Sequence, residues 1–129
     1  MSPSAAKQGD SIVATDTHLV QPPGTSPPVP GPYPFNGTID GNLSSDVTIE
    51  GMPAATLGST ATNTPPHIPV GGTFVNPPTN QGTITAGSAT VTINGKPAAR
   101  AGDTAITCND PAPLPVGTVE AVGTVSIGG

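Results

Sequence analysis

Two stretches of the chain alternate apolar and polar residues and then run into a pair of alanines. They read DVTIEGMPAATLGS at residues 46–59 and TVTINGKPAARAGD at residues 90–103, which places them 44 positions apart. Valine and isoleucine two residues apart are typical of a strand with one apolar face. Asn94 followed by Gly95 is a strong signal for a two-residue hairpin turn, and Glu50 with Gly51 stands at the equivalent corner. The pattern predicts two β-hairpins, each followed by a short Ala-Ala strand.

The two ends of the chain together supply a third copy. Residues 124–129 (TVSIGG) match the first half of the repeat, and residues 2–10 (SPSAAKQGD) match the second half. A Gly-Thr-Ile or Gly-Thr-Val triplet also precedes each Val-x-Ile run, beginning at Gly37, Gly82 and Gly117. The third repeat is therefore circularly split, and we expect residues 2–6 and 125–129 to be neighbours.

Proline-rich stretches separate these units, at residues 21–34, 65–78 and 111–115. Proline lacks the N–H that a sheet ladder needs, so we expect these stretches to be stiff surface loops outside the central sheet. The chain has 17 glycines and 18 prolines in 129 residues, a composition that excludes long helices.

Three short hairpins cannot each bury a core of their own, but hairpins grouped around one axis can share one. Small apolar residues would then face the axis, namely Ala5, Ala54 and Ala98. The sequence predicts one all-β domain over residues 1–129. We expect three pseudo-threefold β-hairpin repeats, the third circularly split, with Pro/Gly-rich loops that form a cone.

The charge balance narrows the choice of partner. Three basic residues stand against eight acidic ones, for a formal net charge of -5. This supply of cations is too small for nucleic acid or for an anionic membrane surface, and we expect neither as a partner. No run approaches the roughly 18 apolar residues of a membrane span, and residues 1–7 lack the apolar segment of a secretory signal. We expect a chain that is cytoplasmic when made, with its one cysteine in no internal disulfide.

Three metal-ligand residue types fall at one position of the repeat. His18 follows Gly9 by nine residues, His67 follows Gly58 by nine, and Cys108 follows Gly102 by six. Alone, each is more often a buried or hydrogen-bonded residue than a ligand. Threefold grouping would bring the three loops together, so we expect His18, His67 and Cys108 to form one metal site.

Histidine and cysteine suit zinc, with iron(II) as the alternative. Three ligands leave tetrahedral zinc one short, and the fourth position is open to Asp16, Asp110, Asn109, Tyr33 or a water. A structural zinc supplies on the order of 10 kcal/mol of apparent folding free energy in small domains. We therefore expect one zinc ion that stabilises a chain poor in large apolar residues.

The sequence PAAR at residues 97–100, followed by Ala101-Gly102-Asp103, resembles the signature of the PAAR-repeat family. Residues 53–59 (PAATLGS) and 4–10 (SAAKQGD) look like degenerate copies, so the resemblance covers essentially the whole chain. Proteins similar to this form a small cone that caps the trimeric spike of contractile injection machines such as type VI secretion systems and phage tails. In that family three histidines and one cysteine typically hold a zinc near the tip. This sequence matches at His18, His67 and Cys108 and has no third histidine.

The resemblance implies a non-enzymatic, metal-stabilised tip that sharpens the spike for membrane puncture and helps to carry effector proteins. Its partner would be a trimeric spike protein with a β-helical end, bound by one monomer per trimer without stable membrane association. The chain would leave the cytoplasm with the spike, toward the outside or the target cell. Three repeats in one chain would resolve the symmetry mismatch by presenting nearly the same surface three times.

The apolar edges of the three hairpins are candidates for docking the spike, since exposed strand groups can pair with a partner's β-structure. The alternative is that the same residues form the internal core. The six residues are Val47, Ile49, Val91, Ile93, Val125 and Ile127.

Two other functions compete with a spike tip. A His-His-Cys set with an open position also occurs at catalytic zinc sites, which would make the chain a small metal-dependent hydrolase. Against this, only Asp16 and Asp110 lie close enough in sequence to a ligand to serve as a general base. The third possibility is a free-standing β-repeat structural protein, which would self-associate.

Overall fold

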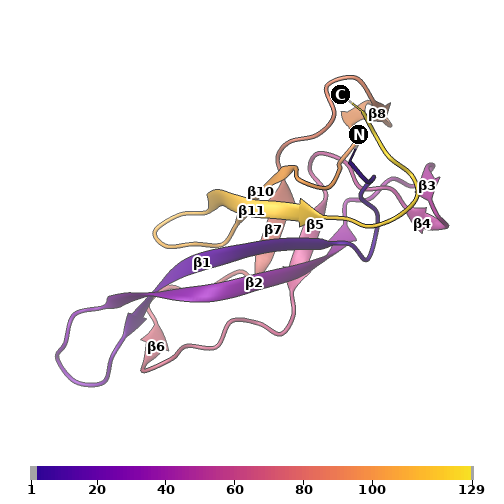
Figure 1. The fold of residues 1–129 in the computed structure, drawn as a ribbon. Coiled ribbons are helices and arrows are strands. Elements are labelled where there is room, and N and C mark those ends of the chain that lie inside the picture. The colour runs from indigo at the N-terminus through magenta and orange to yellow at the C-terminus, as the bar shows by residue number, and fades with distance from the viewer. Residues whose placement is uncertain (1–2, 129) are drawn as a thin grey trace.

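The computed structural model describes residues 3–128, and in them every regular element is a β-strand. Six antiparallel strands form a closed barrel in the order β11-β10-β7-β5-β2-β1, closed by pairing of β11 with β1 (Figure 1). The barrel strands are β1 (Ser11–Gln21), β2 (Val29–Gly41), β5 (Thr60–Asn63), β7 (Gln81–Ile84), β10 (Thr104–Thr107) and β11 (Leu114–Glu120). A short strand, β6 (Thr73–Phe74), pairs with the end of β1. The all-β prediction is confirmed.

The barrel core follows from the period-2 alternation of its strands. In β2, Tyr33, Phe35, Gly37 and Ile39 are buried, and the alternate residues Pro34, Asn36 and Thr38 are exposed. Opposing strands supply Ile12, Ile84 and Val119, each at most 1% exposed. Each Gly-Thr-Ile or Gly-Thr-Val triplet begins inside a barrel strand, namely β2, β7 or β11.

The proline-rich stretch at residues 21–34 was expected to lie outside the sheet, and this expectation is wrong for its second half. Pro30, Pro32 and Pro34 belong to β2 and lie opposite Leu19, Thr17 and Thr15 of β1. β5 joins the other side of β2 only from Gly37 onward. The prolines thus occupy exposed positions on a part of β2 with one strand neighbour, where a missing N–H costs no ladder bond. Pro115 likewise lies in β11.

The two predicted hairpins are confirmed. β3 (Thr48–Ile49) pairs with β4 (Met52–Pro53), and β8 (Thr92–Ile93) pairs with β9 (Lys96–Pro97). Both turn residues of each hairpin have positive φ: 52° and 82° at Glu50 and Gly51, 53° and 79° at Asn94 and Gly95. Positive φ at both positions is the requirement of a type I′ turn, which matches the twist of the paired strands.

The chain ends meet beside these hairpins. Ser4 forms an antiparallel bridge with Ser126, and the Ala5 amide donates to the Val125 carbonyl at 2.9 Å. This confirms the predicted contact between the two ends; residues 2 and 129 lie outside the described part of the chain.

Three alanine pairs lie at the centre of this end of the molecule. Ala6 donates to Ala99 (3.0 Å), Ala99 to Ala55 (3.1 Å) and Ala55 to Ala6 (3.0 Å), so the three backbone bonds form a closed ring. Ala5, Ala54 and Ala98 pack in one cluster with Ile49, Ile93 and Ile127 and are at most 1% exposed, which confirms that they face inward. Three backbones this close leave room only for small side chains.

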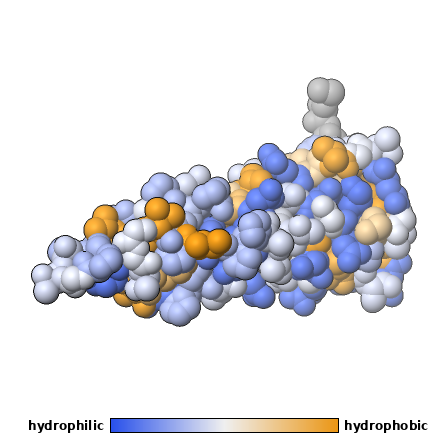
Figure 2. Space-filling model, turned by 90° about the horizontal axis from the view of Figure 1, so that it is seen from below, coloured by the Kyte–Doolittle hydropathy of each residue, from blue (hydrophilic) through white to orange (hydrophobic). Residues whose placement is uncertain are grey.

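The molecule tapers along its length. Figure 2 shows a broad end, where the hairpins and the termini lie, and a narrow end, where the loop between β1 and β2 projects (compare Figure 1). Among residues 3–128 no helix has the length and apolarity to cross a membrane.

Candidate metal centre

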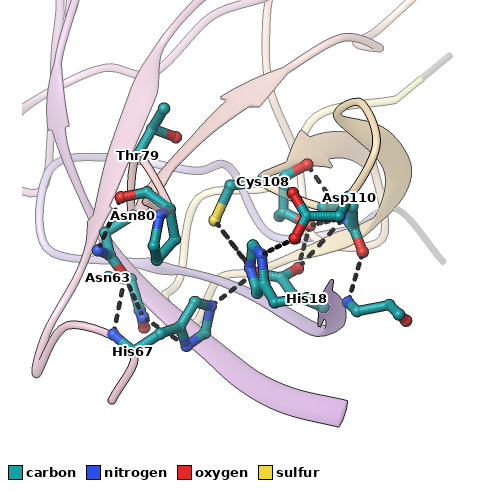
Figure 3. Close-up of polar contacts among 12 residues, drawn as sticks. His18, Asn63, His67, Thr79, Asn80, Cys108 and Asp110 are labelled. Atoms are coloured by element: carbon teal, nitrogen blue, oxygen red, sulfur yellow. Dashed lines mark hydrogen bonds and ion pairs between the residues drawn. The ribbon is translucent and has the colours of Figure 1, made fainter. Parts of the chain in front are cut away.

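The three predicted ligands lie together inside the molecule, with one further residue. His18 is on β1, Cys108 directly follows β10, and His67 is in the segment after β5. Asp16 precedes His18 by two residues and therefore lies on the same face of β1. Ligand atoms of Asp16, His18, His67 and Cys108 all lie within 4.8 Å of one another, and Figure 3 shows the two imidazole rings and the thiol converging.

The separations between these atoms suit a small tetrahedral ion. The Cys108 Sγ is 3.4 Å from Asp16 Oδ2 and 3.7 Å from His18 Nε2. Asp16 Oδ2 also lies 2.8 Å from His67 Nε2 and 4.0 Å from His18 Nε2. Ligands of tetrahedral zinc, at bond lengths of about 2.0–2.3 Å, stand about 3.3–3.7 Å apart. Two imidazoles, a thiol and a carboxylate, with the side chains of all four at most 5% exposed, fit zinc with only small side-chain adjustments.

From the sequence, Asp16 was one of several candidates for the fourth ligand. It is fully buried, and its Oδ1 accepts a hydrogen bond from the Thr107 hydroxyl, with Asn109 Nδ2 at 3.5 Å. These contacts turn Oδ2 toward His67 and Cys108.

The other residues considered for a fourth ligand have different partners. Asn109 Oδ1 accepts from the Thr17 amide at 2.7 Å, and the Tyr33 hydroxyl accepts from the Val70 amide at 3.2 Å. The Asp110 carboxylate lies on the opposite side of the His18 ring, 3.5 Å from Nδ1.

The chemistry of Cys108 is set by its surroundings. Burial, and then the negative charge of Asp16, raise the pKa of the thiol to about 11. Without a metal the thiol is therefore protonated at neutral pH and donates to Asp16 Oδ2. Coordination needs the thiolate, so metal binding here would release a proton.

Polar residues at or near strand ends form hydrogen bonds to the cluster, and their role was not predicted from the sequence. Asn63 Nδ2 lies 3.3 Å from His67 Nδ1 and donates to Asn80 Oδ1 at 3.1 Å, and the same Asn80 oxygen accepts from the His67 amide at 2.9 Å. Asn63 and Thr107 each end a barrel strand five residues after the glycine of their repeat, Gly58 or Gly102. That shared position is the signal that would have found them.

The six candidate docking residues divide into two groups. Ile49, Ile93 and Ile127 are buried, at 5%, 8% and 7% exposure, whereas their partners two residues earlier are open to solvent. Those partners have similar exposures: 37% at Val47, 37% at Val91 and 40% at Val125. The isoleucines therefore form core, and only the valines offer an apolar surface.

Comparison with known proteins gives one family match. Residues 76–129 match the family model described as PAAR motif. No curated protein and no solved structure matches the chain.

Proposed function

Because residues 76–129 of this chain belong to the PAAR motif family, we propose that the protein is a non-enzymatic, metal-stabilised tip that caps and sharpens the trimeric spike of a contractile injection apparatus. The family motif is the observation that carries this proposal. The taper from a broad end to a narrow end supports it, because a cap for a puncturing spike needs a flat base and a point. The tip would be delivered with the spike and would carry effector proteins with it.

The proposal includes three pseudo-threefold repeats, the third formed by the two chain ends. Three corresponding backbone bonds support this arrangement: Ala54 to Val47 (3.0 Å), Ala98 to Val91 (3.0 Å) and Ala5 to Val125 (2.9 Å), each from amide to carbonyl. The closed ring of Ala6, Ala55 and Ala99 would lie on the axis of this arrangement. A single chain with this geometry offers a trimer three similar surfaces.

The docking surface we propose is the broad end, with Val47, Val91 and Val125 as its apolar contacts. Their similar exposure and their corresponding positions two residues before buried isoleucines support a threefold surface. The buried isoleucines would fix the hairpins from below and leave the valines for the partner.

The metal site we propose consists of His18, His67 and Cys108, with Asp16 as the fourth ligand. Zinc is the ion that this donor set favours, with iron(II) as the alternative. A bound ion would tie β1 to the segments after β5 and β10, and so would stabilise the narrow half of the molecule. Four protein donors leave a tetrahedral ion no open position for water, which favours a structural over a hydrolytic role.

Co-purification with a spike trimer tests this function. The tagged chain and a trimeric spike protein of a contractile injection system are expressed together, and the mass of the complex is measured by light scattering. We expect one chain per trimer. Three chains per trimer, or a chain that associates only with itself, would contradict the proposal, and self-association would favour the structural alternative.

A matched pair of variants tests the docking surface. Replacing Val47, Val91 and Val125 together by aspartate should abolish binding to the trimer, because a charge in a desolvated contact has no partner. The control replaces Val29, Val70 and Val75 by aspartate. These valines are 51%, 77% and 43% exposed and lie outside the β3–β4 and β8–β9 hairpins. Binding that survives the first set and fails with the second would place the docking surface elsewhere.

A further inference from the structure

The far side of the His18 ring holds a buried polar atom without a hydrogen-bond partner. His18 is 1% exposed, and its Nδ1 is the one such buried side-chain atom among residues 3–128. The nearest charged atom is Oδ2 of Asp110, 3.5 Å away, on a side chain that is 6% exposed (Figure 3). An unsatisfied buried nitrogen costs about 1–3 kcal/mol, so its persistence needs a reason.

Asp110 is held against β1 by backbone contacts on both sides of His18. Its amide donates to the Thr17 carbonyl at 2.8 Å, and its Oδ2 accepts from the Leu19 amide at 2.7 Å. β11 pairs with β1 only at Ser11, Ile12 and Val13, so Asn109 and Asp110 take over this edge of β1 further along. The carboxylate therefore has a fixed place beside the ring.

We propose that Asp110 is a positioning residue for the metal centre. Its carboxylate keeps the His18 proton on Nδ1, and the lone pair on Nε2 is thereby left free to bind a metal together with Asp16 and Cys108. The inference rests on the metal site of the proposed function. A histidine that binds a metal through one nitrogen commonly donates its other N–H to a carboxylate, which sets the tautomer and strengthens the ligand. A bound cation would polarise the ring, and a small shift would shorten the 3.5 Å contact into a charge-assisted hydrogen bond.

The two histidines are supported differently. His67 Nδ1 faces the neutral Asn63 amide, and its Nε2 already contacts Asp16 at 2.8 Å. Only His18 has a carboxylate behind it. Loss of the Asp110 charge should therefore act on His18 and leave His67 unchanged.

Metal affinity is the first test. Zinc binding to the full chain is measured by competition with a chromophoric chelator for the wild type, Asp110→Asn and Asp40→Asn. Asparagine keeps an oxygen for the Leu19 amide, while Asp40 is an exposed carboxylate on β2 that accepts a hydrogen bond from the Thr62 hydroxyl. We expect Asp110→Asn to weaken zinc binding about 10- to 100-fold and Asp40→Asn to have no effect. Equal affinities of Asp110→Asn and the wild type would overturn the inference.

The tautomer of His18 is the second test, and it needs no metal. Nitrogen-15 NMR of the metal-free protein should show the His18 proton on Nδ1 in the wild type and a shift toward Nε2 in Asp110→Asn, with His67 unaltered. A His18 proton on Nε2 in the wild type would overturn the inference even if the variant fails to fold. Weaker zinc binding without a change of tautomer would also overturn it, because Asp110 would then act only on the fold. A wild type that binds no zinc refutes the metal centre, and with it the role of Asp110 toward a metal.

Discussion

At the scale of single residues, burial and the nearby charge of Asp16 raise the pKa of the Cys108 thiol. This thiol is 5% exposed and lies 3.4 Å from a fully buried carboxylate, and both features disfavour a thiolate. A proton must therefore leave this site when a cation enters it, and the positive charge of the cation compensates for the lost proton.

The raised thiol pKa gives a prediction for the metal-free protein. The pKa rises from 9.0 to about 11 on folding, so the folded chain holds this proton more tightly than the unfolded chain. The stabilisation is complete below about pH 9 and is lost as the pH rises toward 11. Urea unfolding with a chelator present should show this loss in the wild type and a smaller loss in Cys108→Ser, which has no thiol to ionise. Parallel stability curves for the two proteins across this range would refute the assigned environment.

The sequence predicted part of the site because the repeat places His18, His67 and Cys108 at related positions. Asp16 could not be singled out, because its role depends on β1 being a strand, which puts Asp16 and His18 on one face. Nothing in the sequence shows that Thr107 and Asn109 turn the Asp16 carboxylate inward, since both contacts span more than 90 positions.

At the scale of elements, glycine allows the barrel strands to pack closely against neighbouring side chains and backbone. A Cβ at Gly37 would lie 2.7 Å from the Phe35 ring and 3.0 Å from Ala61 Cβ, and one at Gly117 would lie 3.0 Å from the Ala105 carbonyl. These glycines begin the repeated triplets, so the repeat carries a packing requirement as well as a strand pattern.

Replacement of Gly37 by alanine tests that requirement. The added methyl group has no space beside Phe35, and we expect a loss of about 1–3 kcal/mol in the free energy of unfolding. The control is Thr38→Ala, an exposed neighbour on the same strand, with an expected change of about 0.5 kcal/mol or less. Chemical denaturation measures both; an equally stable Gly37→Ala protein would mean that Phe35 and Ala61 leave room for a methyl group at this position.

The hairpins were predictable because their turn and strand signals are local. The barrel was not, because its strands pair residues far apart in the chain, such as Ile12 with Val119. The prolines of β2 were wrongly placed outside the sheet for the same reason. A proline is tolerated in a strand where the edge that carries its nitrogen has no neighbouring strand, and the sequence does not show which edges are paired.

At the scale of the whole molecule, different interactions stabilise the broad end and the narrow half. The broad end is closed by a ring of backbone bonds around small alanines, and the narrow half by a polar cluster that joins β1 to two distant segments. The composition, which is poor in large apolar residues, suits this division. Backbone bonds and polar side-chain contacts need little apolar volume.

The metal is the central claim, and native mass spectrometry of the purified chain with added zinc tests it most directly. We predict a monomer that carries one zinc ion per chain, and Cys108→Ser should lose that ion under the same conditions. A metal-free monomer in excess zinc, or a variant that keeps the ion as well as the wild type does, would contradict the account.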